Sequence, residues 1–463
     1  MRLLRYSLAI LAFCHVTQAG AKTASDFFPI CTAPGASTGR TLTVDPSSRS
    51  PGGLSTIDAA MKAAHPGDVI SLAGGDYGEL KITGANQGGF VTIAAAPGQT
   101  PKFTRISIKG SHWRLTGLTV SGFSNYGLYP NGSVIRKPLV SIGDSDNIIF
   151  EHNIVQSQAG QYDWKPEVPR MPSPTAVSSG ISAMQSSCVS LVENRVSNVW
   201  DAISIGGDQA GNHGKYALVG GNAIDNFAGD GIDHYGSHVR IENNRITNGH
   251  GICNNLCIHN DGIQGWNWNN RTDLLNTDVV INNNEIVVQA DPKLVLAADA
   301  FQGITIFNGN WDGVQILNNV IIANAWHGIT VFGARNVSII NNTVLPANPK
   351  RNTWITYSPG KDARQADSNK VVIRNNIARE ISIYKHEPVE GAVLDHNLTI
   401  RNPDDLSNIF VKFDLANSVF DLHPSKRSDA KGEGSAEGAP STDIEGRPRK
   451  GSVDIGAYAY NGN

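Results

Sequence analysis

Residues 280–287 read VINNNEIV, residues 315–322 read QILNNVII and residues 338–345 read SIINNTVL. In each segment apolar and polar residues alternate up to an asparagine, and the pattern occurs nine times in the chain. Five of the eight gaps between the shared asparagines are 21, 22, 23, 28 and 34 residues, and the other three are longer. A repeat in this range predicts a solenoid whose units stack on one another. The shared asparagines are Asn153, Asn194, Asn222, Asn244, Asn284, Asn319, Asn342, Asn376 and Asn397.

The segments between about residues 69 and 400 are strand-length, rich in Val and Ile, and punctuated by Gly, Asn and Asp. Helical periodicity is absent, and the leucine spacing of leucine-rich repeats is missing. We therefore predict an all-β fold, a right-handed parallel β-helix, in which each strand pairs with its equivalent one coil away, at ~4.8 Å. The repeated asparagines are expected to stack at a tight turn and to supply the left-handed backbone that such turns need.

The two ends of the chain depart from this repeat. Residues 1–21 combine early arginines, an apolar run and an A-x-A ending, which predicts a secretory signal peptide and a secreted or periplasmic protein. Residues 55–64, STIDAAMKAA, predict a short helix that caps the first coil. No later stretch reaches the ~20 apolar residues of a membrane span. The expected divisions are 1–21 signal peptide, 22–54 irregular segment, 55–423 β-helix, 424–450 polar loop or connector, and 451–463 a strand docking on the helix.

Charge and cysteines restrict the function further. The net charge is −3, and the sequence holds no basic stripe that would bind nucleic acid. We also expect the protein to be a monomer. Cys31, Cys188, Cys253 and Cys257 remain after cleavage and can form two disulfides in an oxidising compartment, with Cys253–Cys257 the favoured local pair. A zinc site is the alternative, but no second ligand pair stands nearby. Cys14 does not fit a lipoprotein cysteine well, because the bulky Phe13 precedes it where a small residue is expected.

A second signature recurs between the asparagines, as in SGISA at 179–183, DAISI at 201–205, DGIDH at 230–234 and DGIQG at 261–265. Aligning the isoleucines, which should point inward, gives two columns of flanking residues. The column after each isoleucine should point outward, whereas a bend decides the direction of the column before it. The column before reads Ser179, Asp201, Asp230, Asp261, Gln302 and His327. The column after reads Ser182, Ser204, Asp233, Gln264, Thr305 and Thr330.

Stacked coils would hold successive aspartates of the first column about 5 Å apart. Carboxylates that close cannot all stay ionised away from bulk water, so either a cation lies among them or one of them holds a proton. An all-oxygen set suits Ca²⁺, which makes Asp201, Asp230, Asp233 and Asp261 the expected metal ligands. The alternative is that the first-column aspartates cap turns before glycine.

Insertions in a solenoid commonly lie on its binding face, and several follow these columns. Trp suits stacking on a sugar ring, and Arg or Lys suits a uronate carboxylate. A lone His or Trp is more often a packing residue, but here they gather around the carboxylates. The candidate catalytic residues are Asp233, His234, Tyr235, His259, Lys215 and Arg271. The candidate substrate-binding residues are Trp164, His213, His250, Gln264, Trp266 and Trp268.

These motifs resemble parts of right-handed β-helix carbohydrate-active proteins. Residues 229–233, GDGID, are similar to the D-D-G-x-D calcium segment of one pectate lyase family, with Gly229 where that family has Asp. Residues 201–203 are similar to its preceding D-G-F, but no Lys follows one coil later, where its base is expected.

Two other families share fragments of the same stretch. Residues 231–234, GIDH, are similar to the G-x-D-P-H of C5-epimerases without the proline. Residues 249–251 resemble the G-H-G of polygalacturonases, and Asp230 with Asp233 resembles its N-T-D-G-x-D, without the Asp-Asp segment between them. Alginate lyases share the architecture.

The resemblance implies a secreted lyase that cleaves a uronate-containing polysaccharide by β-elimination. A cation or Arg271 would neutralise the uronate carboxylate, a base would remove the C5 proton, and an acid would assist the leaving oxygen. The alternatives are a glycoside hydrolase that uses paired aspartates, a uronate C5-epimerase, and a carbohydrate-binding surface solenoid without activity.

Overall fold

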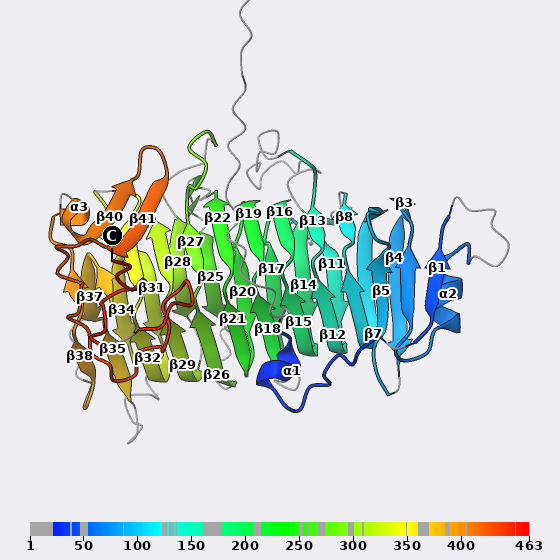
Figure 1. Cartoon of the computed structure of the whole chain (residues 1–463), viewed down its shortest axis with the longest axis horizontal. Helices are drawn as coiled ribbons and strands as arrows, with labels where there is room; N and C mark the ends of the chain where they lie inside the picture. Colours follow the sequence, from blue (N-terminus) through cyan, green and yellow to red (C-terminus); the bar gives the residue numbers. More distant parts are fainter. Residues whose placement is uncertain are drawn as a thin grey trace, which may run out of the picture.

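The structure is a computed structural model that describes residues 22–462 except 38, 47–53, 87, 123–126, 129–133, 136, 161–177, 208–213, 251–252, 255, 258–259, 267–273, 295–300, 308–309, 349, 360–369, 385–388, 403–404 and 450. It confirms the right-handed parallel β-helix. Strands from successive coils line up along the long axis, from β1 and α2 at one end to β37 and β38 at the other (Figure 1). The expected signal peptide lies outside the described residues, and no helix among those described is long and apolar enough to cross a membrane.

Each central coil contributes one strand to each of three faces, and every pairing along a face is parallel. The first face consists of β4 (Glu79–Ala85), the first half of β7 (Arg105–Thr116), β11 (Pro138–Gly143), β14 (Ser179–Met184), β17 (Ile203–Gly206), β20 (Ile232–Tyr235), β25 (Asn260–Trp266), β28 (Phe301–Phe307), β31 (His327–Phe332), β34 (Trp354–Ser358) and β37 (Glu380–Ile383).

The second face continues from the first at a bend and belongs to the same hydrogen-bonded sheet, because β7 runs through both. It consists of β1 (Thr41–Val44), β2 (Val69–Leu72), β5 (Val91–Ala95), the second half of β7, β12 (Asp146–Glu151), β15 (Ser187–Val192), β18 (Ala217–Gly220), β21 (Val239–Glu242), β26 (Leu275–Asn282), β29 (Asn310–Leu317), β32 (Ala334–Ile340), β35 (Val371–Arg374) and β38 (Val393–Asp395).

The third face is a separate sheet. It consists of β3 (Gly75–Asp76), β6 (Pro101–Phe103), β8 (Thr119–Ser121), β13 (Ile154–Gln156), β16 (Arg195–Val199), β19 (Ala223–Phe227), β22 (Arg245–Gly249), β27 (Glu285–Val287), β30 (Val320–Ala323), β33 (Thr343–Pro346), β36 (Ile377–Ala378) and β39 (Leu398–Thr399). Three antiparallel hairpins lie outside the faces: β9 (Gly127–Leu128) with β10 (Val134–Ile135), β23 (Cys253–Asn254) with β24 (Leu256–Cys257), and β40 (Phe410–Asp414) with β41 (Val419–Pro424).

The core consists of aliphatic columns that run along the solenoid. The aligned isoleucines of the x-G-I signature form one of them, and each is at most 1% exposed. A glycine precedes five of the seven aligned isoleucines, where the chain enters the first face, and at those five positions there is little room for a side chain. A Cβ on Gly231, for example, would lie 2.5 Å from the carbonyl oxygen of Gly262. The isoleucine column is Ile181, Ile203, Ile232, Ile263, Ile304, Ile329 and Ile355.

The repeated asparagines form a continuous hydrogen-bonded ladder at the turn between the second and third faces. Asn244 shows the unit: its backbone N–H and its side-chain Nδ2 both donate to Oδ1 of Asn284, at 3.0 and 2.9 Å. The same pair of bonds joins every successive step from Asn153 to Asn397. The ladder side chains are nearly all fully buried, so their amides satisfy backbone groups that water cannot reach.

One part of the expectation for the ladder is wrong. The left-handed residue of each turn is the one before the ladder asparagine, such as Asn243 with φ +57° or Asn283 with φ +56°. Gly, Glu or His fills this position in other coils. The two asparagines of an N-N pair therefore do different work: the first adopts the left-handed backbone, and the second makes the ladder.

Residues 22–32 cross the second face as an N-terminal strap. Within it, α1 (Ala24–Phe27) donates the N–H of Ala24 to Oγ of Ser190, at 2.7 Å, and Phe28 is buried against Tyr216. A disulfide joins Cys31 to Cys188 on β15, which is the pair left over if Cys253 pairs with Cys257. The side chains of that second pair lie outside the described residues. Helix α2 (Ile57–Ala63), capped by the Thr56 side chain, packs at the first coil as expected.

Loss of this disulfide should destabilise the protein by releasing the strap. The cysteines are 157 residues apart in sequence. In the chain-entropy treatment a closed loop of that size contributes up to about 5 kcal/mol. We expect the variant with both Cys31→Ala and Cys188→Ala, or reduced wild type, to melt at a lower temperature, and the strap to become protease-sensitive. If reductant lowers the melting temperature of this double variant as much as that of wild type, the effect does not arise at this bond.

The C-terminal residues form a folded cover rather than a loose connector. Helix α3 (Leu406–Ile409), the β40–β41 hairpin and residues 424–462 pack over the outer side of the last strands of the third face. Residues 424–449 are held by their own turns, and the final segment docks through Ile455 and Ala457 without forming a strand. It meets the left-handed turn residues: the Nδ2 of Asn341 donates to the carbonyl oxygens of Asp454 and Gly456.

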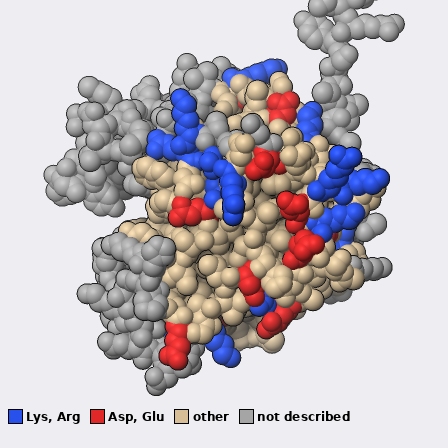
Figure 2. All heavy atoms as spheres, turned by 90° about the vertical axis from the view of Figure 1, so that its left-hand side faces the viewer, with Lys and Arg blue, Asp and Glu red and all other residues tan. Residues whose placement is uncertain are grey.

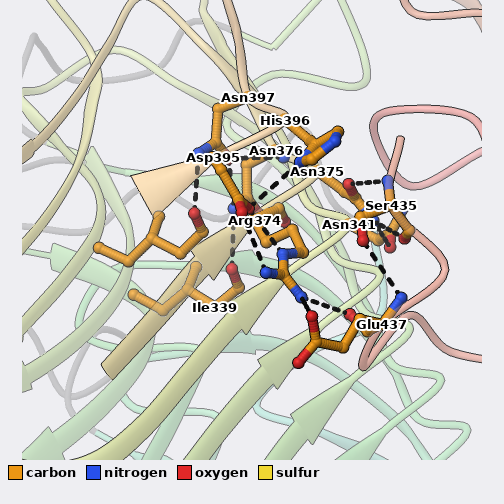
Figure 3. A network of polar contacts seen from close by, with 11 residues as sticks. Ile339, Asn341, Arg374, Asn375, Asn376, Asp395, His396, Asn397, Ser435 and Glu437 are labelled. Carbon is orange, nitrogen blue, oxygen red and sulfur yellow. Dashed lines mark hydrogen bonds and ion pairs between the residues drawn. The ribbon is translucent and has the colours of Figure 1, made fainter. Parts of the chain in front are cut away.

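A buried arginine joins this cover to the last coils (Figure 3). Arg374, on β35, donates from Nε and Nη2 to the Asp395 carboxylate at 2.6 and 3.0 Å, and from Nη1 to the carbonyl oxygen of Glu437 at 3.0 Å. Beside it, Nδ2 of Asn375 donates to the carbonyl oxygen of Ser435. One guanidinium thus bridges two coils and the C-terminal segment, which fixes the position of the cover.

Candidate active site

The second of the two sequence columns lies in the expected register on the outer side of the first face. Strand pairing places Ser182 beside Ser204, Ser204 beside Asp233, and Asp233 beside Gln264. Gln264 is followed by Thr305 and then Thr330 in the next coils. Asp233 is thus the only carboxylate in a run of small or neutral polar side chains.

The first column also turns outward, which the alternation of residues could not decide. Carboxylate oxygens of Asp201, Asp230 and Asp233 all lie within 4.8 Å of one another. Asp261 joins them one coil further on, because its backbone N–H donates to Oδ1 of Asp230 at 2.7 Å, and its Oδ2 accepts from Nε2 of Gln264 at 2.7 Å. We call Asp201, Asp230, Asp233 and Asp261 the carboxylate cluster.

Among the described residues, no positively charged group lowers the pKa of Asp233 or Asp261. Burial raises the pKa of Asp233 well above its usual range, and the charges of the other three members raise it further. Burial and the charge of Asp230 likewise raise the pKa of Asp261, although hydrogen bonds from Thr305 and Gln264 work in the opposite direction. At neutral pH the cluster therefore either holds protons or binds a cation.

The donor set of the cluster fits Ca²⁺. All its ligand atoms are carboxylate oxygens, which are the ligands that this ion prefers. Asp233 is partly exposed, but its Oδ1 is shielded from solvent and accepts no hydrogen bond from a described residue. A buried carboxylate oxygen without a donor costs free energy that a cation would recover.

A steric clash explains why glycine, and not the aspartate of the pectate lyase motif, stands at position 229. A Cβ at this position would lie 2.0 Å from Oδ1 of Asp201, so an aspartate there cannot coexist with the present position of Asp201. The fourth carboxylate of the cluster comes instead from Asp261, in the following coil, and this residue is fully buried.

The geometry is against a catalytic role for His234. It follows Asp233 on β20, so its side chain points to the opposite side of the strand, into the core, where it is 0% exposed. The ring packs edge-on against Trp311 at 5.5 Å, and Gly265 leaves the space it occupies, since a Cβ there would lie 2.7 Å from Nε2. Burial lowers the pKa of His234 to about 3, so the imidazole is neutral and separated from the cluster.

His234 should instead make the fold acid-sensitive. Because its pKa is about 3 when folded and ordinarily 6.5, the unfolded chain binds the extra proton between these values, and stability falls as pH falls through that window. At about pH 5 the loss is roughly 2 kcal/mol. We expect His234→Leu to retain activity and to lose less stability than wild type between neutral pH and pH ~5 in denaturant titrations. His65→Gln, at an exposed histidine, is the control; equal acid sensitivity of wild type and His234→Leu would contradict the assignment.

Tyr235 and Gln264 do lie beside the cluster. Burial, with a contribution from Asp233, raises the pKa of Tyr235 to about 12. Its hydroxyl reaches Sδ of Met184, two coils away, at 3.4 Å, by passing over Gly206. A phenol that stays protonated can act as an acid but not as a base at neutral pH.

The remaining candidates are dispersed. His250 is buried just after β22, where burial lowers its pKa to about 4. Its Nε2 contacts Oδ1 of Asn226 at 2.6 Å, and Nδ2 of Asn226 donates to Oδ1 of Asn198, so His250 belongs to a buried polar row on this side of the solenoid. Lys215 is half-buried before β18, where its carbonyl oxygen accepts from the N–H of Cys188, and no described contact joins its ammonium group to the cluster. Trp266 is half-buried on the outer side of β25. Trp164, His213, His259, Trp268 and Arg271 lie outside the described residues.

A third outward column escaped the sequence analysis. It lies three residues after each aligned isoleucine, where Ile304 leads to Phe307 and Ile329 to Phe332. The signal was present in the same alignment, since the alternation of a strand places this position on the same side as Asp233. The column reads Met184, Gly206, Tyr235, Trp266, Phe307, Phe332, Ser358 and Tyr384.

Comparison with known proteins agrees with the architecture. Residues 179–344 match the family described as the right-handed β-helix region. Pectate lyase Pel9A is similar, with a TM-score of 0.43 and 16% identity over 92% of this chain and 98% of that one. A family 6 polysaccharide lyase from Pseudopedobacter saltans gives a TM-score of 0.43 and 13% identity over 76% and 92%.

The A-module of a mannuronan C-5 epimerase from Azotobacter vinelandii gives a TM-score of 0.39 and 13% identity over 74% of this chain and 93% of that one. No curated protein matches. The matched region covers six of the stacked coils that carry the asparagine ladder and the isoleucine column. The chain is a right-handed parallel β-helix protein.

Proposed function

We propose that this protein is a secreted polysaccharide lyase that cleaves a uronate-containing polysaccharide by β-elimination at the carboxylate cluster. The observation that carries the proposal is the convergence of Asp201, Asp230 and Asp233 within 4.8 Å on the outer side of the first face, with a shielded oxygen on Asp233. The proposal depends on these residues and on the motif resemblance, not on the overall likeness to the solved structures. The disulfide Cys31–Cys188 supports an oxidising compartment.

The cluster would hold Ca²⁺ through Asp201, Asp230, Asp233 and Asp261. When bound, the ion would neutralise the uronate carboxylate and so acidify the C5 proton. Gln264 keeps Asp261 oriented through its 2.7 Å hydrogen bond. Ser204, the neighbour of Asp233 in the preceding coil, has a small, half-buried side chain on the outer side of the face, where we place a sugar ring beside the carboxylates.

Proton transfer requires two further groups. Tyr235, which keeps its proton at neutral pH, suits the acid that assists departure of the 4-oxygen. We propose His259 or Lys215 as the base and Arg271 as a group that steadies the uronate. His234 is left out because it faces the core.

The test is turnover of a panel of acidic polysaccharides, with calcium and with chelator, measured by the ultraviolet absorbance of the unsaturated uronate and by new reducing ends. The proposal expects both signals with calcium and neither with chelator. The variants His259→Gln, Lys215→Met and Tyr235→Phe then identify the base and the acid. Cleavage of a uronate glycan with reducing ends but no absorbance would exclude elimination.

A glycoside hydrolase is the second candidate, favoured by one observation. Asp233 lies beside Asp230, and burial with the charge of Asp230 raises its pKa, so without a cation it would hold a proton next to an ionisable partner, which is the arrangement of an acid/base pair. This candidate predicts reducing ends without the absorbing product and turnover that chelator does not remove. Epimerisation would change neither chain length nor absorbance, and binding without turnover would indicate a carbohydrate-binding protein.

A further inference from the structure

The third outward column carries a series of aromatic side chains on the C-terminal side of the carboxylate cluster, interrupted once at Ser358. We call Trp266, Phe307, Phe332 and Tyr384 the aromatic row. Trp266 pairs with Phe307 in the next coil, and the ring centroids of Phe307 and Phe332 are 5.4 Å apart. Tyr384 reaches Phe332 at 5.3 Å from two coils away, across the small Ser358. The row therefore extends along the solenoid axis from β25 to β37.

The aromatic row lies on one side of the carboxylate cluster only. On the N-terminal side of the cluster the same column holds Gly143, Met184 and Gly206, so these coils contribute no aromatic side chain of their own, and the ring over Gly206 is that of Tyr235. On the C-terminal side the rings are only partly covered, and Tyr384 is 40% exposed. Large apolar groups on the outer side of a sheet lose hydrophobic stabilisation where they meet water. A series that begins beside the cluster and continues in one direction is better explained by a ligand than by packing.

The chemistry of the row fits a carbohydrate chain. Aromatic faces bury the C–H faces of pyranose rings, and polar side chains beside them can hydrogen-bond sugar hydroxyls. The neighbouring outward column supplies Gln264, while His327 lies edge-on to Phe307 at 5.4 Å. Coils repeat every ~4.8 Å, which is similar to the size of one sugar unit in an extended chain.

The charged side chains described toward the C-terminal end are single groups and do not form one field of the same sign. Arg351 lies over Trp326, 5.0 Å from the ring centre, and Trp326 is 45% exposed at the start of the coil of β31. Figure 2, which looks onto the C-terminal end, shows acidic and basic side chains interspersed rather than one basic field. Because the chain also has a net charge of −3, we expect ring contacts and single cations, not long-range attraction, to recognise an acidic glycan.

We propose that the aromatic row binds the sugar rings of the acidic polysaccharide on the C-terminal side of the carboxylate cluster. The bound glycan then runs along the solenoid axis from β25 toward β37. This rests on the proposed function for the identity of the glycan and extends it by assigning the binding surface. It predicts that affinity increases with glycan length until the chain spans the row.

The experiment is affinity electrophoresis of the full chain in gels that contain each acidic polysaccharide of the panel, with calcium present. We expect Phe332→Ala and Tyr384→Ala each to weaken binding about fivefold to tenfold, and Phe332→Trp to restore it. Val411→Ala, at a 43% exposed position on β40, is the matched control and should bind as wild type does. Melting curves of every variant check that the fold is intact; Tyr384, in the last coil, is the safer of the two sites.

The outcomes separate this proposal from the lyase proposal. If both aromatic variants bind like wild type, or if wild type binds no acidic glycan, the row is not a glycan surface, whatever product the enzyme makes. If the aromatic variants lose binding but no unsaturated product forms, the row stands and the lyase assignment fails. Equal binding of neutral glycans of the same length would overturn the acidic specificity.

Discussion

Asp233→Asn should abolish turnover and at the same time stabilise the calcium-free protein. The variant removes a proposed calcium ligand, and even the partners behind metal ligands change activity on the order of 10- to 100-fold, so the loss should be at least that large. It also removes the carboxyl whose ionisation is opposed by burial and by Asp230. An amide has the same shape and no charge, so the calcium-free fold gains stability at neutral pH. Activity assays and thermal melts in chelator measure the two effects.

The pH dependence supplies a second measurement of the same effect. The pKa values of Asp233 and Asp261 are raised in the folded protein, so above 3.8 the folded state binds protons that the unfolded chain has lost. Calcium-free wild type should therefore lose stability as pH rises through the raised pKa values, and calcium should restore more stability at neutral than at acidic pH. Asp76→Asn, at an exposed aspartate on β3, should change neither property. If Asp233→Asn melts at a lower temperature than wild type in chelator, the claim that the carboxylate cluster destabilises the calcium-free protein is contradicted.

Asn284→Ala should be among the most destabilising single substitutions in the chain. Oδ1 of Asn284 accepts the backbone N–H and the side-chain Nδ2 of Asn244, and its own Nδ2 donates to Asn319 and to the carbonyl oxygen of Ile241 at 2.9 Å. The residue is fully buried, so water cannot replace these bonds. Loss of the buried acceptor and donor should cost about 2–4 kcal/mol. Denaturant unfolding of wild type and variant measures it.

The neighbouring residue provides the matched control. Asn283 has φ +56°, a conformation that glycine adopts without strain. Asn283→Gly should therefore change stability by less than about 0.5 kcal/mol, although the residue type and the location are the same as for Asn284. Equal destabilisation by the two substitutions would mean that the ladder amides are not the source of the stability.

Sequence periodicity was enough to predict the coil and the residues that stack along it. The asparagine repeat gave the fold and the ladder, and the isoleucine alignment placed Ser204, Asp233 and Gln264 in one outward column. These properties are periodic, and a stacked solenoid turns sequence period directly into spatial neighbours. The same alternation places His234 in the core; grouping it with the site relied on its closeness to Asp233 in sequence, which in a strand means the opposite side.

Several features of the site and of the C-terminal cover depend on contacts between coils and could not be predicted from the sequence. Asp201 and Asp230 stand just before β17 and β20, and Asp261 is the second residue of β25, so strand alternation does not fix their direction. Their convergence on Asp233 depends on the path of the chain into the first face. The clash between a side chain at Gly229 and Asp201 involves two coils and has no sequence pattern. Likewise, the left-handed residue of each ladder turn is set by backbone geometry that both residues of an N-N pair could satisfy. The packing of the C-terminal cover depends on the hydrogen bond from Arg374 to Glu437, which lies 63 residues further along the sequence. A repeat pattern cannot predict a contact between a coil and a segment outside the repeat.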